Sequence, residues 1–146
     1  MNIYCKFIIS VDTLYLLRYN VITASKEQLM YEIEFYEDIY GKSEVYEYIQ
    51  QLRNNLNKDN KQKLKKIYMY IDLLSQEGLK LSEPYIKKLD KEIWELRPLR
   101  DRILFASWRK NKFVLLSTFK KQTRKTPKRE LEKAKKLLED YKKRSE

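Results

Sequence analysis

The side chains in this sequence that could do chemistry are mostly cations, and they are concentrated in the second half of the chain. Residues 85–146 carry 21 lysines and arginines against nine acidic residues, whereas residues 30–84 carry eight against ten. A planar guanidinium can bind two phosphate oxygens at once, and a lysine ammonium binds phosphate as a point charge. This distribution predicts a polyanionic partner. Nucleic acid is favoured over an anionic membrane, because the cations lie on predicted strands as well as on a helix. A lysine-rich surface that serves only solubility is the alternative.

The chain contains one cysteine, Cys5, and no histidine. This composition excludes an intramolecular disulfide and any zinc site built from cysteine and histidine, and it fits a reducing cytoplasm. We expect no metal or other cofactor. Because no side chain has an ordinary pKa near neutrality, proton transfer would need a group whose pKa is shifted. Lys6, Asp12 and Arg18 interrupt the apolar runs of residues 1–23, which argues against an export signal or a membrane span.

The elements that must position these cations begin with a predicted strand over residues 30–36, where apolar residues alternate with two glutamates. Ser43 can cap a first helix, and Gly78 is a natural end for a second. Between them, apolar residues recur at helical spacing in two stripes that should pack as a helical hairpin: Val45, Tyr48, Ile49, Leu52 and Leu56, then Leu64, Ile67, Tyr68, Ile71 and Leu74.

Three short runs rich in Ile, Leu, Phe, Trp and Val follow, and they predict strands over residues 92–97, 102–108 and 112–119. The corner at Lys110 and Asn111 suits a hairpin between the last two strands, since asparagine tolerates the left-handed backbone that such turns often require. Thr126 followed by Pro127 starts a final helix with one apolar side. The predicted order is strand, two helices, three strands and helix, in a single domain.

Residues 1–29 stand outside this order. Lys26 and Glu27 can be encoded as AAG GAG, a bacterial ribosome-binding sequence, two codons before that of Met30. We therefore hypothesise that translation begins at Met30 and that the domain spans residues 30–146. The alternative is a genuine extra strand or helix, which the apolar residues of this stretch could support.

Four motifs carry a resemblance to a known group of proteins. Residues 30–36 (MYEIEFY), 89–97 (LDKEIWELR), 102–105 (RILF) and 119–127 (FKKQTRKTP) resemble the amino terminus, successive sheet motifs and carboxy-terminal signature of HigB-like toxins in the RelE/ParE superfamily. The last motif is the most specific. The resemblance covers about residues 30–141 of this sequence.

The resemblance implies an α+β fold of the RelE type: a small twisted antiparallel sheet, a helical hairpin after the first strand, and a C-terminal helix. It implies the toxin of a type II toxin–antitoxin system, a cytoplasmic, metal-independent endoribonuclease that cuts messenger RNA in the ribosomal A site and so inhibits translation. The implied partners are messenger RNA, the 70S ribosome and a cognate antitoxin, usually a helix-turn-helix protein of the HigA type. The toxin–antitoxin complex would be an oligomer that binds operator DNA through the antitoxin.

The resemblance also implies roles for individual residues. Arg102 matches the arginine that follows a sheet turn in RelE-like enzymes and would stabilise the extra negative charge of the pentavalent phosphorane. Lys121, with Lys120 beside it, would hold the leaving oxygen or protonate it. Arg97 matches the family's strand arginine, and Glu83, in a Glu-Pro step, resembles the general base of YoeB-like members. An exposed loop glutamate is the alternative for Glu83.

Arg100, Lys88 and Lys125 are interpreted as clamps on the RNA backbone, although each could be a solvated surface charge. The sequence departs from RelE at Ile93 and Glu95, where that protein resembles a paired-lysine pattern, and no histidine follows the last strand. Proton transfer must therefore be arranged differently, and we expect catalysis to depend on groups or geometry supplied by the ribosome.

Two other functions remain open. A ParE-like gyrase poison would share the fold without ribonuclease chemistry. A non-catalytic RNA-binding or ribosome-associated protein would need the cationic half but no single essential residue.

Overall fold

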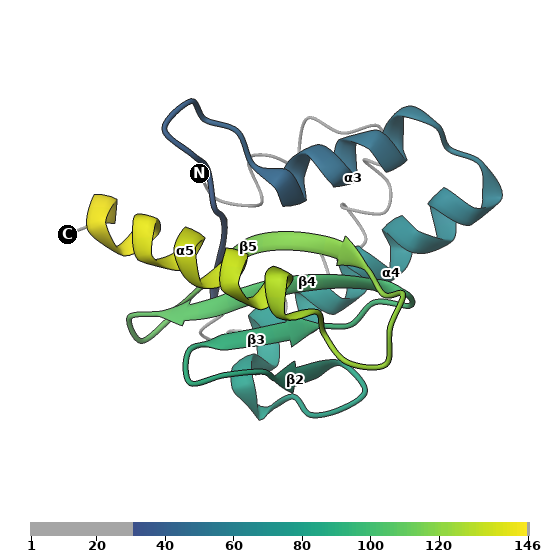
Figure 1. Ribbon diagram of the computed structural model, residues 1–146. Coiled ribbons are helices and arrows are strands. Elements are labelled where there is room, and N and C mark those ends of the chain that lie inside the picture. The colour runs from purple at the N-terminus through teal and green to yellow at the C-terminus, as the bar shows by residue number, and fades with distance from the viewer. Residues whose placement is uncertain (1–30, 146) are drawn as a thin grey trace.

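The computed structural model describes residues 31–145, and these form one sheet with helices on both faces (Figure 1). The strands lie in the order β1-β5-β4-β3-β2. Helix α5 covers one face, and α3 and α4 cover the other (Figure 1). The expected α+β class is confirmed. The elements are β1 (Glu32–Phe35), α3 (Glu44–Asn54), α4 (Lys58–Glu77), the 3-10 helix η1 (Gly78–Lys80), β2 (Ile86–Lys88), β3 (Ile93–Leu96), β4 (Asp101–Trp108), β5 (Lys112–Lys120) and α5 (Lys128–Ser145).

The helical hairpin forms as predicted, and local caps fix its ends. The Ser43 hydroxyl accepts a hydrogen bond from the Tyr46 amide at 3.3 Å, and the Asn57 side chain accepts one from the Asn60 amide at 2.8 Å. Gly78 ends α4 with a φ of 61°. A Cβ on this glycine would lie 2.6 Å from the Tyr31 ring, so the same residue ends the helix and lets the start of β1 approach it.

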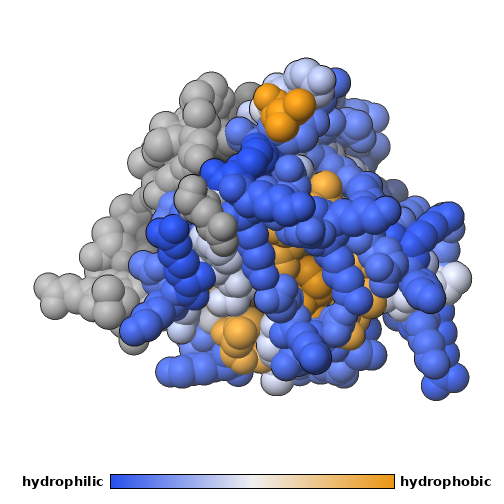
Figure 2. All heavy atoms as spheres, turned by 60° about the vertical axis from the view of Figure 1, so that its left-hand side comes forward, coloured by the Kyte–Doolittle hydropathy of each residue, from blue (hydrophilic) through white to orange (hydrophobic). Residues whose placement is uncertain are grey.

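The sheet separates two apolar layers, and alternation along each strand decides which residues enter which layer. One layer packs against α3 and α4 and includes Ile33, Phe35, Leu96, Ile103, Phe105, Phe113 and Leu115. The other packs against α5 and includes Ile93, Leu104, Ala106, Val114, Leu116, Ala134 and Leu138. Figure 2 shows the outer surface near the C-terminal end of α5 as mostly hydrophilic, with apolar residues visible between charged side chains.

Two features of the sheet differ from the expectation. Strand β1 pairs with β5 in parallel, so the sheet is mostly rather than wholly antiparallel. Apolar and polar residues alternate in the same way in parallel and antiparallel strands, so the sequence pattern could not predict the direction of β1. Strand β2 was not predicted, because only three residues of a short polar segment pair with β3 at the edge of the sheet.

A β-bulge interrupts the pairing of β4 with β5. Leu104 pairs with Ser117 and Phe105 pairs with Leu115, so Leu116 is an extra residue on β5. A bulge reverses the facing of every later residue on its strand. Phe119, beyond the bulge, accordingly packs in the same layer as Val114, on the α5 side of the sheet.

The turn between β4 and β5 is a hairpin, as predicted, but its left-handed residue is Arg109, with a φ of 56°, and not Asn111. The hypothesis that the domain starts at Met30 concerns residues outside the described range. Among the described residues, no helix is long and apolar enough to cross a membrane.

We predict that Asp72→Asn stabilises the protein at about pH 8 by roughly 1 kcal/mol. Burial raises the pKa of Asp72 to about 6, and hydrogen bonds from Gln76 and Ser75 oppose this shift. A folded-state pKa above the unfolded one means that the carboxylate costs stability above this pH, and that the cost fades as pH falls through about 6. Urea unfolding should show the advantage of the variant disappearing near pH 4.

Asp59→Asn, in the first turn of the same helix, is the matched control. It should give no gain, because a negative charge there is favoured by the helix dipole. Equal stabilities of the wild type and Asp72→Asn at pH 8 would contradict the prediction.

Candidate nucleic-acid interface

A cavity of about 280 Å³ opens at one end of the sheet, beneath the loop that joins β5 to α5. Figure 1 shows this loop, residues 121–127, swinging past the ends of β3 and β2 before α5 begins. Seven cations line the cavity: Lys87, Lys88, Arg97, Arg102, Lys121, Arg124 and Lys125. Glu95 is the single acidic residue among its lining residues. We call this cavity the cationic cleft.

Alternation and the bulge bring these residues together from distant parts of the chain. Glu95 on β3 and Arg97 just after it follow Ile93 at period two, so they lie on the face that α5 covers. Arg102 lies two residues before Leu104 on β4 and shares that face. Beyond the bulge of β5, Lys121 lies on the cleft side, where an unbroken strand would have placed Lys120 instead.

Glu95 is the centre of the cleft and is only 3% exposed. Its Oε1 atom lies 3.4 Å from Nε of Arg97 and 3.4 Å from Nε of Arg102. Its Oε2 atom accepts a hydrogen bond from the Thr126 hydroxyl. A buried carboxylate is costly unless it is paired and hydrogen-bonded, and here both oxygens are engaged.

Arg102 is held almost completely inside the protein, with 5% of its surface exposed. Its Nη1 atom donates to the carbonyl oxygens of Leu99 at 2.9 Å and Asp101 at 2.8 Å. Burial lowers the pKa of Arg102, and the carboxylate of Glu95 opposes that shift. Among the described residues Nη2 has no hydrogen-bond partner, so this atom is left to contact a bound anion.

The loop over the cleft is fixed at both ends and carries exposed cations between them. The Lys121 amide donates to the Arg100 carbonyl at 2.8 Å at one end, and the Thr126 hydroxyl donates to Glu95 at the other. Within the loop, the Thr123 hydroxyl donates to the Lys125 carbonyl at 2.6 Å. Arg124 and Lys125 are exposed. Backbone bonds therefore leave these long cationic side chains free to follow a polyanion.

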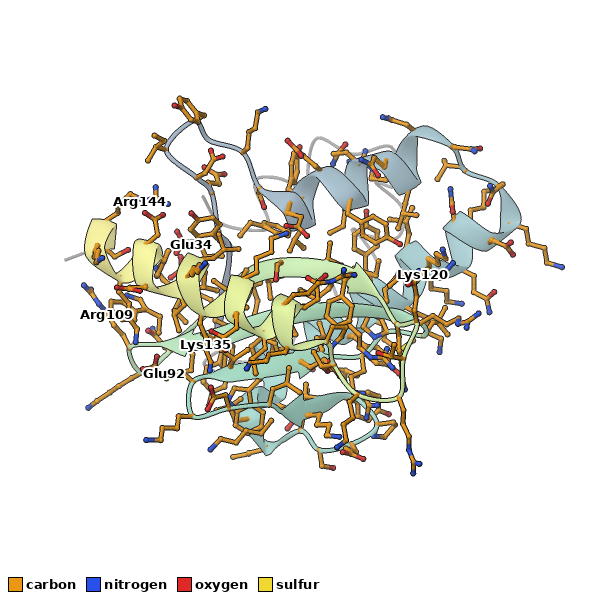
Figure 3. The ribbon with its side chains drawn as sticks, in the orientation of Figure 1. Glu34, Glu92, Arg109, Lys120, Lys135 and Arg144 are labelled. Atoms are coloured by element: carbon orange, nitrogen blue, oxygen red, sulfur yellow. The ribbon has the colours of Figure 1, made fainter. Side chains whose placement is uncertain are left out.

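The cleft cations differ in their pairing from several cations at the opposite end of the sheet. At the opposite end of the sheet, where Figure 3 labels Arg144, cations are neutralised by acids: Arg144 lies 2.7 Å from Asp140, and Lys142 lies 2.6 Å from Glu92. Within the described part of the chain, five of the seven cleft cations have no carboxylate within 4 Å: Lys87, Lys88, Lys121, Arg124 and Lys125. The cleft therefore gathers unbalanced positive charge from several segments of the chain around one cavity.

Five of the residues singled out from the sequence line the cleft: Arg97, Arg102, Lys121, Lys88 and Lys125. The Lys88 ammonium lies over the ring of Trp94, 5.5 Å from its centroid, which holds this cation at the rim.

Three of the singled-out residues do not line the cleft. Lys120 is exposed, and Figure 3 shows it at the end of β5, projecting away from α5. Arg100 is exposed in the β3–β4 turn. The Glu83 side chain is 63% exposed, with its carboxylate 3.9 Å from Nη1 of Arg97.

Sequence reasoning missed four residues of the cleft: Glu95 as its centre, and Lys87, Arg124 and Thr126. Alternation already placed Glu95 on the face of Arg97, and that signal could have identified it. Lys87 could not be found in this way, because it pairs with Glu95 from a strand that was not predicted.

The arrangement is suited to holding a phosphate diester. Guanidinium groups bind phosphate oxygens in a fixed plane, and the surrounding lysines attract the rest of a polyanionic chain. Among the described residues, no group of three or more histidine, cysteine or acidic side chains could hold a metal ion.

The fold and the cleft together define a class: a small α+β protein of the RelE type with a cationic site at one end of its sheet. The chain belongs to the family described as phage derived protein Gp49-like (DUF891), whose model matches residues 54–139, more than half of the sequence and all of the cleft. This family is part of the RelE/HigB-like toxin group, so the resemblance drawn from the sequence is confirmed at that level. No curated protein matches the chain.

We predict that the full chain binds single-stranded RNA with a strong dependence on salt, and that Lys125→Ala makes this dependence shallower. Each phosphate contact that is lost should reduce the slope of log affinity against log salt by about 0.7. Fluorescence anisotropy across a salt series measures the slope. Lys65→Ala removes an equally exposed lysine from α4 and should leave the slope unchanged. Equal slopes for the two variants would argue against RNA binding in the cleft.

Proposed function

We propose that this protein is a HigB-like toxin of a type II toxin–antitoxin system, a ribosome-dependent endoribonuclease that cuts messenger RNA. The observation that carries the proposal is the convergence of Arg97, Arg102 and Lys121 in one cleft. These are the cations to which the resemblance assigned catalytic roles, and they come from three separate segments of the chain. Membership of the Gp49-like family supports the same function.

The proposed reaction is an attack of the ribose 2′-oxygen on the adjacent phosphorus. The bond from phosphorus to the 5′-oxygen breaks, which leaves a 2′,3′-cyclic phosphate and a free 5′-hydroxyl. One proton leaves the 2′-hydroxyl and one is delivered to the departing 5′-oxygen. Arg102 and Arg97 stabilise the negative charge of the phosphorane, and Lys121 stabilises or protonates the leaving oxygen.

The general base is the part of this mechanism that the cleft supports least. Both oxygens of Glu95 are already engaged, one by two guanidinium groups and the other by the Thr126 hydroxyl. Glu83 lies at the rim, beside Arg97, and is the better placed carboxylate for a substrate that covers the cleft. Because the sequence has no histidine, we propose that the ribosome completes the site by fixing the messenger RNA in an attack geometry.

The proposal includes a cognate antitoxin of the helix-turn-helix, HigA-like type, encoded beside the toxin. The toxin–antitoxin complex would be an oligomer that binds operator DNA through the antitoxin. Co-expression of the neighbouring small open reading frame should restore growth to cells that produce the toxin.

We predict that induction of the chain arrests growth and produces codon-phased cuts in messenger RNA, and that Lys121→Ala abolishes both. The matched control is Lys120→Ala, because this neighbouring lysine lies outside the cleft. Mapping of messenger RNA 5′ ends after induction provides the measurement. A conservative Arg102→Lys change should also reduce cutting, since an ammonium cannot replace the bidentate guanidinium.

Other outcomes of this experiment favour other functions. Growth arrest with intact messages would favour the function of a gyrase poison. A DNA-nicking assay with gyrase would then test that function. No arrest, or equal losses from Lys120→Ala and Lys121→Ala, would favour an RNA-binding protein without catalysis.

We further predict that purified protein cuts naked RNA much more slowly than the same message on a programmed ribosome. The expected difference is large, because positioning alone can contribute on the order of a hundredfold or more. Primer extension on both substrates, at equal protein concentration, makes the comparison. Efficient cutting of naked RNA would contradict dependence on the ribosome.

A further inference from the structure

The carboxylate of Glu95 lies in the cleft but has no role in the proposed reaction. It lies among seven cations that would bind an anionic substrate, and its own negative charge opposes that binding. We propose that Glu95 is a positioning residue: it aligns Arg97 and Arg102 for the transition state and ties the β5–α5 loop over them. This inference rests on the proposed ribonuclease function.

The alignment follows from the way in which the two arginines share one oxygen. Two guanidinium groups beside each other repel, and an anion between them is the simplest way to hold both in place. Glu95 Oε1 lies 3.4 Å from Nε of Arg97 and at the same distance from Nε of Arg102. Because Glu95 is contacted at Nε, Nη2 of Arg102 keeps no hydrogen-bond partner among the described residues, and Nη1 of Arg97 lies 3.9 Å from the exposed Glu83 carboxylate. We expect these terminal nitrogens to bind one phosphate.

The second oxygen of Glu95 fixes the loop. Its bond with the Thr126 hydroxyl joins the loop to β3, and among the described residues no other side chain of residues 121–127 is hydrogen-bonded to the sheet. The loop carries Lys121, Arg124 and Lys125 into the cleft. One buried carboxylate thus contacts both arginines and the loop that carries the other cations.

This role makes an unusual prediction for Glu95→Gln: RNA affinity and cleavage rate should change in opposite directions. Removing the negative charge should leave RNA binding as tight as in the wild type or roughly two- to fivefold tighter. The cleavage rate on programmed ribosomes should fall by about a hundredfold, because the arginines lose their alignment. A residue that only supports the fold would not separate the two quantities.

The affinity is measured with 2′-O-methyl RNA, which lacks the attacking hydroxyl, and the rate is measured in single turnover on programmed ribosomes. Glu92→Gln removes the same charge at the opposite end of the sheet, where Glu92 pairs with Lys142 outside the cleft, and should change neither quantity. Thr126→Val removes only the bond to the loop and should slow cleavage with unchanged affinity. A Glu95→Gln variant that cuts at the wild-type rate or faster would overturn the proposal.

Nuclear magnetic resonance of the wild type tests the same geometry without any variant. The Nε–H signals of Arg97 and Arg102 should be shifted by the carboxylate that lies 3.4 Å from each and slow to exchange with solvent, and 2′-O-methyl RNA should perturb both. Two ordinary, rapidly exchanging signals would refute the alignment even if Glu95→Gln fails to fold. A wild type that binds RNA with these signatures but cuts no message would instead refute the ribonuclease function alone.

Discussion

The pairing of β4 with β5 is the constraint on which the rest of this domain depends. These two strands lie in the middle of the sheet, between β1 on one side and β3 and β2 on the other, and both helical layers pack against them. The bulge at Leu116 makes this strand pairing important for the cleft. By adding one residue, it reverses the facing of the end of β5, so that Phe119 closes the α5 layer and Lys121 enters the cleft.

The cleft illustrates how a protein keeps several cations close together. Arg97 and Arg102 are compensated by Glu95, while the cations around them have no carboxylate partner among the described residues, and all of these except the half-buried Lys121 are exposed to solvent. Burying Arg102 at the start of β4 fixes its direction, because the Leu99 and Asp101 carbonyls bind one terminal nitrogen and leave the other. Rigid placement of this kind is what the stabilisation of a developing charge requires, since no energy is then spent on reorganisation.

Helix α5 packs on one face of the sheet, and α3 and α4 pack on the other. Helix α5 is fastened to β1 at its far end, where the Tyr36 hydroxyl donates to Asp140 and the Tyr141 hydroxyl donates to Glu34. Its near end follows directly from the loop that covers the cleft. The hairpin of α3 and α4 supports the other face through the larger apolar layer. The cleft is thus built on strand ends and on a loop that the Thr126–Glu95 hydrogen bond ties to β3.

The sequence by itself determined the class of the fold, most of the elements and the chemical character of the site. Periodicity and capping residues identified the helices and four of the five strands, because these signals are local. The concentration of cations predicted the polyanion site. Only the tertiary structure decided that β1 runs parallel to β5, that Lys87 faces the cleft from an edge strand, and that Lys121 rather than Lys120 lines it. Those outcomes depend on strand register and on one bulge, which arise from contacts between segments far apart in the chain and leave no local pattern in the sequence.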